Sequence, residues 1–251
     1  CNSGTYQPNY GQSSCIDSSP GYYVDNTAMS NQTACLGGTF NPNHGSISSN
    51  DCITTSPGYY SSSGSGSQNP CQSGTYQPLT GQTNCTSTDP GYYVPGISYV
   101  LQLSCNPGTY QPNSGSSDCL IADAGYYVDS YSSDTQTACP AGTFNPVNGS
   151  SSYSSCIDTS PGYFTPISGM SEEYPCNPGT YQPLGGQDNC TNSSPGYYVP
   201  MNASTTQEPC IAGMYQSNHG RTYCEYPSSG YYVPTSSSSN QTRAEPGYYA
   251  N

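Results

Sequence analysis

The sequence predicts a small disulfide-rich repeat protein, an elongated rod or solenoid of short β-hairpin and loop modules with little helix. Three observations predict this class. The 251 residues include fourteen cysteines, a Cys-x-x-Gly-Thr-Tyr phrase recurs along the chain, and only 31% of the residues are hydrophobic. Such a chain cannot bury a large mixed core. Disulfides and the stacking of neighbouring units must therefore supply its stability.

The cysteines never lie closer together than fourteen positions, so the chain has no Cys-x-x-Cys pair of the kind that holds zinc or exchanges disulfides. Disulfide bonds are the simplest interpretation, and they imply an oxidising compartment. We therefore expect a secreted, extracellular or cell-surface protein. The cysteines are Cys1, Cys15, Cys35, Cys52, Cys71, Cys85, Cys105, Cys119, Cys139, Cys156, Cys176, Cys190, Cys210 and Cys224.

Every second cysteine, starting from Cys1, marks the beginning of a repeat, because these cysteines follow one another at nearly constant intervals. Each copy reads Cys-x-x-Gly-[Thr/Met]-[Tyr/Phe]-[Gln/Asn]-[Pro/Ser], then a loop with a second glycine, then the second cysteine and, in most copies, Pro-Gly-Tyr-Tyr. We expect repeats at 1-34, 35-70, 71-104, 105-138, 139-175, 176-209 and 210-243, and the start of a degenerate eighth at 244-251.

A longer period lies above this repeat. The second and fifth repeats carry Phe40 and Phe144 in place of tyrosine, and their two cysteines stand farther apart than those of the other repeats. The chain thus forms a triplet of repeats over 1-104 and a second triplet over 105-209. Two explanations stay open: tandem duplication without geometric meaning, or an assembly in which every third repeat meets the same neighbour.

Two glycines recur in every repeat, one shortly after the first cysteine and one in the following loop. Gly4 and Gly11 are the first such pair. Glycine in matching places of seven copies indicates a positive φ or a close approach of another backbone segment.

Two disulfide registers are compatible with the spacing. Pairing within each repeat joins Cys1 with Cys15 and leaves no cysteine unpaired, whereas pairing between repeats strands Cys1 and Cys224. The C-terminal stretch places Ala244 where the next cysteine would stand, which favours the first register. Closing a loop of this length contributes about 3 kcal/mol.

Tyrosine recurs after the first glycine of most repeats, and an aromatic pair such as Tyr22 and Tyr23 follows the second cysteine. We expect the contacts between repeats to be largely aromatic. In an extended pair one ring faces inward and the next outward. A packing role and a carbohydrate-binding role for the exposed rings both stay open.

The Cys-x-x-Gly-Thr-Tyr phrase, the loop, the second cysteine and Pro-Gly-Tyr-Tyr resemble the ephrin-receptor-like and growth-factor-receptor cysteine-rich repeats. The half between the cysteines is also similar to the simple modules of tumour-necrosis-factor receptors. The resemblance runs from Cys1 to Pro234 and implies an extended array of small modules, as in extracellular fibre and mastigoneme-type proteins of algae and protists. The family has a further cysteine where this chain has Ser18 and Ser193.

Few residues suggest chemistry. His44 and His219 stand in polar Asn-His-Gly turns, and Glu172 and Glu173 are the only adjacent carboxylates. No catalytic, nucleotide-binding or calcium-loop motif is present, so we expect no enzyme, no cofactor and no metal site. A net charge of -13 with two arginines and no lysine argues against nucleic acid as a partner.

We also expect no membrane insertion of this segment, because its most apolar stretch, Gly96 to Leu103, is far too short to span a bilayer. We expect that stretch to pack locally. The Ser-Gly-rich stretch 61–67 reads as a flexible insertion. Since the sequence starts at Cys1 without a leader, we expect any signal peptide to have been removed or to lie outside this piece.

Asn-x-Ser/Thr sequons predict N-linked glycans on exposed loops. They start at Asn31, Asn84, Asn148, Asn189, Asn192, Asn202 and Asn240, and O-linked glycans are a further expectation.

These features predict a structural subunit of an extracellular glycoprotein filament, flagellar hair or surface layer. Such a subunit would assemble with copies of itself by repeat stacking. The alternative is a ligand-binding or adhesive ectodomain segment of a cell-surface receptor.

Overall fold

A computed structural model describes residues 1–247 of the chain. It is a small disulfide-rich repeat protein made of two-stranded hairpins and loops. By compactness the chain divides into two units, one of Cys1–Leu120 with Ser130–Thr135 and one of Ile121–Asp129 with Gln136–Asn251. The repeat boundaries expected from the sequence remain a prediction, because this division does not follow them.

Each hairpin consists of two short antiparallel strands. In the first unit, within the described residues, the pairs are β1 (Thr5–Tyr6) with β2 (Ile16–Asp17), β3 (Tyr22–Tyr23) with β4 (Thr33–Ala34), β5 (Thr39–Phe40) with β6 (Ile53–Thr54), β7 (Tyr59–Tyr60) with β8 (Asn69–Pro70), β9 (Thr75–Tyr76) with β10 (Thr86–Ser87), and β11 (Tyr92–Tyr93) with β12 (Leu103–Ser104). β13 (Thr109–Tyr110) pairs with β14 (Leu120–Ile121), in which the boundary of the units falls.

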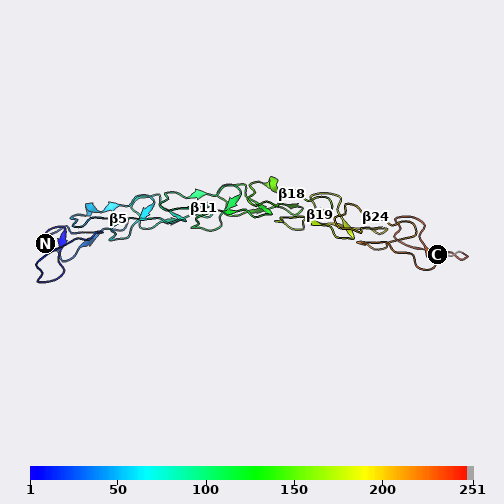
Figure 1. Cartoon of the computed structure of the whole chain (residues 1–251), viewed down its shortest axis with the longest axis horizontal. Helices are drawn as coiled ribbons and strands as arrows, with labels where there is room; N and C mark the ends of the chain where they lie inside the picture. The colour runs from blue at the N-terminus through cyan, green and yellow to red at the C-terminus, as the bar shows by residue number, and fades with distance from the viewer. Residues whose placement is uncertain (248–251) are drawn as a thin grey trace. The chain divides into compact units, whose positions relative to one another are not determined.

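The second unit continues the pattern. Its described pairs are β15 (Tyr126–Tyr127) with β16 (Thr137–Ala138), β17 (Thr143–Phe144) with β18 (Ile157–Asp158), β19 (Tyr163–Phe164) with β20 (Tyr174–Pro175), β21 (Thr180–Tyr181) with β22 (Thr191–Asn192), β23 (Tyr197–Tyr198) with β24 (Glu208–Pro209), and β25 (Tyr231–Tyr232) with β26 (Thr242–Arg243). An isolated bridge joins Tyr215 to Glu225. Within each unit the hairpins follow one another in chain order (Figure 1).

The only helical elements among residues 1–247 are two 3₁₀ turns, η1 (Ser49–Asp51) and η2 (Tyr153–Ser155). Both lie in the longer disulfide loops, whose cysteines have a sequence separation of 17 instead of 14. Ser48 caps η1 by accepting a hydrogen bond from the Asn50 N–H at 3.1 Å, and Asp51 accepts from the Ser48 N–H at 3.1 Å. The extra length of these loops is therefore folded into a capped turn.

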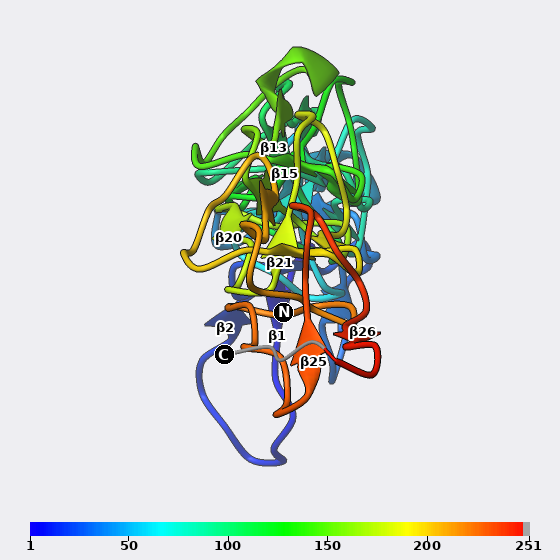
Figure 2. The ribbon, with the colours of Figure 1, turned by 90° about the vertical axis from the view of Figure 1, so that its right-hand side faces the viewer.

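The hairpins reveal that the structural unit is half of the repeat seen in the sequence. Cys1 to Asp17 forms one hairpin, and Ser18 to Ala34 forms a second of equal length with the same layout. Figure 2 shows one hairpin of each kind, β1 beside β2 and β25 beside β26. We call the two kinds the disulfide half-repeat and the glutamine half-repeat, for the groups that close them.

Neighbouring half-repeats are joined by backbone hydrogen bonds. At the first junction the N–H groups of Gly4 and Gln7 donate to carbonyls of the next half-repeat, Val24 and Met29, at 2.8 and 3.1 Å. In return, the N–H groups of Ser18 and Ala28 donate to Gly4 and Cys1 at 2.8 and 2.9 Å. At about 0.5 to 1.5 kcal/mol each, such a set of bonds contributes about 2 to 6 kcal/mol per junction.

The core is a set of small side chains and not a set of rings. The first residue of each inner half-repeat is at most 1% exposed, and these residues are Ser18, Cys35, Thr55, Cys71, Thr88, Cys105, Ala122, Cys139, Thr159, Cys176, Ser193 and Cys210. A second buried column alternates amides with smaller residues, as in Asn41, Ser61, Gln77 and Val94. Aromatic rings do make contacts between repeats, as at Tyr127 and Tyr153, whose ring centroids are 6.0 Å apart, but they do not form the buried columns.

Two expectations were wrong. In the stretch 61–67, Ser61 is fully buried and the Ser63 hydroxyl donates to the Cys35 carbonyl at 2.9 Å, so this segment is an ordinary part of a half-repeat and not a flexible insertion.

The stretch from Gly96 to Leu103 does not bury its aliphatic side chains, since Ile97 is 59% and Leu101 63% exposed. A short loop over a narrow core gives these side chains nothing to pack against.

Candidate functional site

The first candidate feature is the set of staples that closes each half-repeat. All seven disulfides follow the in-repeat register, one of the two that the sequence left open. They join Cys1 to Cys15, Cys35 to Cys52, Cys71 to Cys85, Cys105 to Cys119, Cys139 to Cys156, Cys176 to Cys190 and Cys210 to Cys224. No cysteine is free in the described part of the chain. Seven disulfides fit an oxidising, extracellular compartment.

The glutamine half-repeat closes in a different way. Ser18 and Gln32 occupy the places of the two cysteines, and the Gln32 side-chain oxygen accepts a hydrogen bond from the Ser19 N–H at 2.8 Å. The same clamp recurs in all seven glutamine half-repeats, with Gln32, Gln68, Gln102, Gln136, Glu173, Gln207 and Gln241. Covalent and hydrogen-bonded closures thus alternate along each unit.

Sequence reasoning missed this clamp, although a signal was present. A glutamine or glutamate stands at a fixed distance before each later first cysteine, as in Gln32 before Cys35, and Gln241 stands in the same way before Ala244. The clamp also gives Glu173 a structural explanation, because its carboxylate accepts from the Ser160 N–H at 2.6 Å. Its neighbour Glu172 is exposed.

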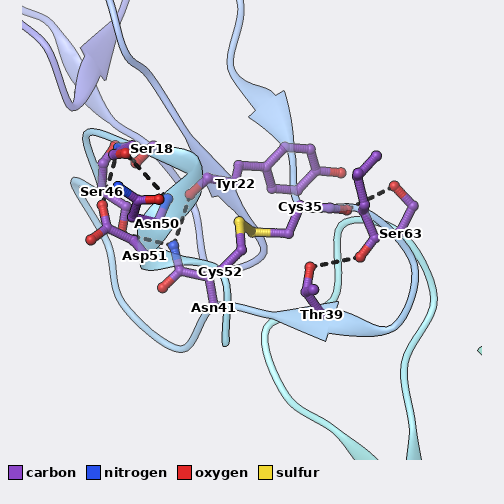
Figure 3. Close-up of a disulfide and its surroundings, with 12 residues drawn as sticks. Ser18, Tyr22, Cys35, Thr39, Asn41, Ser46, Asn50, Asp51, Cys52 and Ser63 are labelled. Atoms are coloured by element: carbon purple, nitrogen blue, oxygen red, sulfur yellow. Dashed lines mark hydrogen bonds between the residues drawn. A yellow bond between two sulfur atoms is a disulfide. The ribbon is translucent and has the colours of Figure 1, made fainter. Parts of the chain in front are cut away.

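An amide side chain braces the loop of each disulfide half-repeat, and it is buried in all of them except the first. In the shorter loops it is glutamine: the Gln77 side chain donates to the Asn84 carbonyl at 2.8 Å and accepts from the Leu79 N–H at 3.1 Å. In the longer loops it is asparagine, and Asn41 donates to the Tyr22 carbonyl at 3.1 Å and to the Ser46 hydroxyl at 2.7 Å (Figure 3). Every buried side-chain polar atom among residues 1–247 has a partner.

The triplet pattern has a local structural counterpart in the second and fifth repeats. Phe40, Asn41, the longer disulfide loop and the 3₁₀ turn occur together beside the Cys35–Cys52 disulfide. Asn145 repeats the arrangement by donating to the Tyr126 carbonyl at 2.8 Å and to the Ser150 hydroxyl at 2.9 Å. The long loop, the asparagine and the phenylalanine therefore form one structural variant.

The fourth residue of every half-repeat is a glycine with positive φ, and in most half-repeats another backbone segment also approaches it closely. Gly91 has φ 82°, and a Cβ placed on it would overlap the carbonyl oxygen of Ser132, two half-repeats further on. The sequence predicted a positive φ or a close approach, and both occur. At such a glycine, a half-repeat thus touches both its next neighbour and the one beyond.

Aromatic rings recur at one place of every half-repeat, and we call this set of rings the aromatic stripe. The sixth residue of every half-repeat is aromatic, namely Tyr6, Tyr23, Phe40, Tyr60, Tyr76, Tyr93, Tyr110, Tyr127, Phe144, Phe164, Tyr181, Tyr198, Tyr215 and Tyr232. Tyr232 is the most exposed of them, at 43%, and the other thirteen are half-buried. Both rings of a pair such as Tyr22 and Tyr23 are partly buried, but the Tyr22 ring lies against Gly64 of the next repeat, whereas Tyr23 lines an open groove.

The stripe carries aliphatic neighbours. Tyr6 pairs across its hairpin with Ile16 and Phe40 pairs with Ile53, which places each pair on one face. These isoleucines are 45% and 48% exposed. Within the described residues only two ring-to-ring contacts occur, Tyr127 with Tyr153 at 6.0 Å and Phe164 with Tyr174 at 6.4 Å. Most of the rings therefore keep a free edge or face.

Two grooves adjoin the stripe at equivalent places in different repeats. One, of 240 Å³, lies beside Tyr23, and its lining comprises Tyr23, Thr33, Ala34, Cys35, Leu36, Thr39, Ser49 and Cys52. The other, of 230 Å³, lies beside Tyr198, and its lining comprises Tyr198, Pro209, Ile211, Met214, Tyr223 and Cys224. Neither lining contains a charged residue.

One titratable group has a shifted pKa. The Glu208 carboxylate accepts a hydrogen bond from the Tyr198 hydroxyl and, with some burial, raises the pKa of that tyrosine above 10.0. His44 and His219 are exposed loop residues, and the structure does not bring them into a cluster with carboxylates. Among residues 1–247 no group of three His, Cys, Asp or Glu side chains could hold a metal ion.

The seven sequon asparagines are exposed in the structure, so each could be reached by a glycosylating enzyme. Asn148 also accepts from the Ala124 N–H through its side-chain oxygen at 2.6 Å. No helix within the described residues is long and apolar enough to cross a membrane.

Comparison with protein-family models finds no match to the chain, and comparison with curated proteins finds none either.

Proposed function

We propose that the chain is a structural subunit of an extracellular glycoprotein filament, flagellar hair or surface layer. The observation that carries the proposal is the sameness of the junctions within each unit. The hydrogen bonds of Gly4 and Gln7 recur at Gly21, whose N–H donates to the Asn41 carbonyl at 2.8 Å, and at Val24, whose N–H donates to Ser46 at 2.9 Å. A chain built from one repeated contact resembles a polymer more than a receptor with one distinct site.

The surface chemistry supports the same conclusion. The chain has a net charge of -13 with only Arg221 and Arg243 as cations, so we propose no nucleic acid partner. The proposal includes no catalysis and no cofactor. Copies of the same chain are the partners, joined by repeat stacking, and N-linked glycans on the exposed sequons and O-linked glycans complete the subunit. The resemblance to the ephrin-receptor-like repeats of extracellular fibre and mastigoneme-type proteins agrees with this role.

A second function has one specific observation in its favour. The loop from Gly96 to Leu103 exposes four large hydrophobic side chains, Ile97 at 59%, Val100 at 44%, Leu101 at 63% and Leu103 at 38%, whereas the equivalent loops of the other glutamine half-repeats expose at most two. A local apolar patch of this kind suits an adhesive or ligand-binding ectodomain segment of a cell-surface receptor. Replacing Ile97 and Leu101 with serine separates the two functions, because this change abolishes adhesion in a receptor and leaves a stacked filament intact. Leu184→Ser is the matched control, since Leu184 is also 63% exposed.

The test of the filament proposal is sedimentation of the unreduced chain over a concentration series, followed by electron microscopy. Filament formation above a critical concentration is the expected result. A chain that sediments as a single species at every concentration, and shows only isolated particles, contradicts the proposal. Reduction of the disulfides is the control, since it opens the disulfide half-repeats and should prevent assembly.

A further inference from the structure

We propose that the aromatic stripe binds neutral linear saccharides, one seated in the uncharged groove beside Tyr23 and another in the uncharged groove beside Tyr198. This inference goes beyond the filament proposal and does not depend on it. Its starting point is that a ring occupies the sixth place of every half-repeat although no ring is needed in the core. The buried columns consist of small residues such as Ser18 and Val24, which are at most 1% exposed.

The rings are available for a ligand. Tyr23 and Tyr198 are partly exposed, and neither contacts another ring within the described residues. An aromatic face is electron-rich and attracts positively polarised hydrogens. The face of a pyranose presents several C–H groups whose carbons carry oxygen, so it matches such a ring. Exposed aliphatic neighbours such as Ile16 and Ile53 extend the apolar surface beside the stripe.

The two grooves define where each saccharide is held. Tyr23 and Tyr198 are the sixth residues of their half-repeats, and Leu36 and Ile211 are the second residues of the half-repeats that follow. Leu36 is 77% and Ile211 67% exposed. The other disulfide half-repeats have Asn, Gln or Pro at this second place, so the two grooves are distinguished by an aliphatic wall opposite the ring.

The lining chemistry selects an uncharged, hydroxyl-rich ligand. No charged residue lines either groove, although the chain has a net charge of -13. Phosphate, sulfate and carboxylate ligands would be repelled by that charge. In the groove beside Tyr23 the polar side chains are the hydroxyls of Thr33, Thr39 and Ser49. The Thr39 hydroxyl already donates to the Leu36 carbonyl at 2.7 Å, which leaves its oxygen free to accept from a sugar hydroxyl.

Repetition of the ring along each unit suits a linear polymer. One ring contact changes an affinity by about two- to tenfold. Several equivalent contacts to one saccharide chain multiply, because the second contact becomes intramolecular after the first. We therefore expect a hexasaccharide to bind at least about tenfold more tightly than a disaccharide of the same linkage.

The experiment is calorimetric titration of the unreduced full chain with cellohexaose, laminarihexaose and chitohexaose. It is made at a concentration where the chain sediments as a single species. The test variant is Tyr23→Leu with Tyr198→Leu, which keeps apolar bulk and removes the ring. Tyr23→Phe with Tyr198→Phe is the rescue, because phenylalanine occurs at the same place as Phe40, Phe144 and Phe164. Tyr10→Leu is the matched control, since Tyr10 lies outside the stripe and is 101% exposed.

The expected result is binding of at least one hexasaccharide, a loss of about fivefold or more in the double leucine variant, and no loss in the phenylalanine or Tyr10 variants. Circular dichroism of the leucine variant checks that it is folded. Failure of all three hexasaccharides overturns the inference, as does equal binding by the leucine variant. Binding of a decaproline peptide in their place also overturns it. A chain that assembles without binding saccharide overturns this inference alone, whereas one that binds saccharide and never assembles overturns the filament proposal alone.

Discussion

Replacing Gly91 with alanine tests whether contacts reach beyond the nearest half-repeat. Gly91 has φ 82°, and an added Cβ would overlap the carbonyl oxygen of Ser132, two half-repeats further along the first unit. The left-handed conformation alone costs alanine about 1 to 2 kcal/mol. Displacing a packed carbonyl adds about 1 to 3 kcal/mol, as for other overpacked sites. We therefore expect a total loss of about 2 to 5 kcal/mol of local stability.

Gly213 is the matched control for this change. It stands at the same place in its half-repeat and has φ 91°, but no atom lies within 4 Å of an added Cβ. Gly213→Ala should therefore cost only the conformational part, about 1 to 2 kcal/mol. Alanine does adopt this region elsewhere in the chain, since Ala28 has φ 58°.

The assay is native-state hydrogen exchange of the amides around each site. For Gly91→Ala the reporters are the Cys105 N–H, which donates to Gly91 at 2.9 Å, and the Ser132 N–H, which donates to Cys105 at 2.9 Å. Their protection should fall at least about fivefold more than protection around Gly213 falls in its own variant. Equal losses at the two sites would refute the contact between half-repeats that are not adjacent.

Three further predictions concern the staples and one tyrosine. Gln32→Ala removes the acceptor of the Ser19 N–H and should lower the free energy of unfolding by about 1 to 2 kcal/mol, as measured by chemical denaturation. Gln12→Ala, on an exposed loop, is the control and should leave that free energy unchanged. Equal losses in the two variants would contradict the clamp. The double change Ser18→Cys with Gln32→Cys should form an eighth disulfide in the oxidised chain. Mass spectrometry would detect it as a loss of two hydrogens and as a cross-linked peptide. Two free thiols would contradict the equivalence of the half-repeats. Because Glu208 raises the pKa of Tyr198 above 10.0, the stability that the neutral tyrosine contributes should be lost as the pH rises above 10.0. Ultraviolet titration of Glu208→Ala, compared with Tyr198→Phe, should show the shift removed, and an unchanged titration would exclude Glu208 as its cause.

Much of the local fold could be predicted from the sequence. Cysteine spacing reduced the disulfides to two registers, and the structure has the one that leaves no cysteine over. The recurring glycines indicated positive φ, and Gly4 with φ 86° and Gly11 with φ 71° confirm it. These features could be predicted because paired cysteines in such a chain form disulfides and a recurring glycine marks a positive φ or a close backbone approach.

The half-repeat was not predicted, since its two kinds share few residue types. Ser18 stands where the family pattern has a further cysteine, and a glutamine such as Gln32 in a polar chain has no single use. The turn that is Gly11 in one half-repeat is Ala28 in the next, at φ 58°, so the matching turn residue was hidden. Only the paired hairpins make the correspondence visible.

The core was assigned to the wrong residues. Tyrosine dominates the apolar content of the sequence, so one ring of each pair, such as Tyr22 and Tyr23, was expected to join the repeats. The structure stacks half-repeats through backbone hydrogen bonds, and the buried columns contain residues such as Ser18, Cys35 and Val24 and no ring. Displaced from the core, the rings form the partly exposed stripe. The candidate binding surface thus follows from the same packing that overturned the aromatic core.

The measurement that most directly tests the structural role is electron microscopy of the native, unreduced material with helical averaging. The account predicts filaments whose density repeats along the axis once per triplet, with the long loops that carry η1 and η2 at equivalent places. Isolated particles that never associate, even when concentrated, would contradict it and would favour the receptor or adhesin segment.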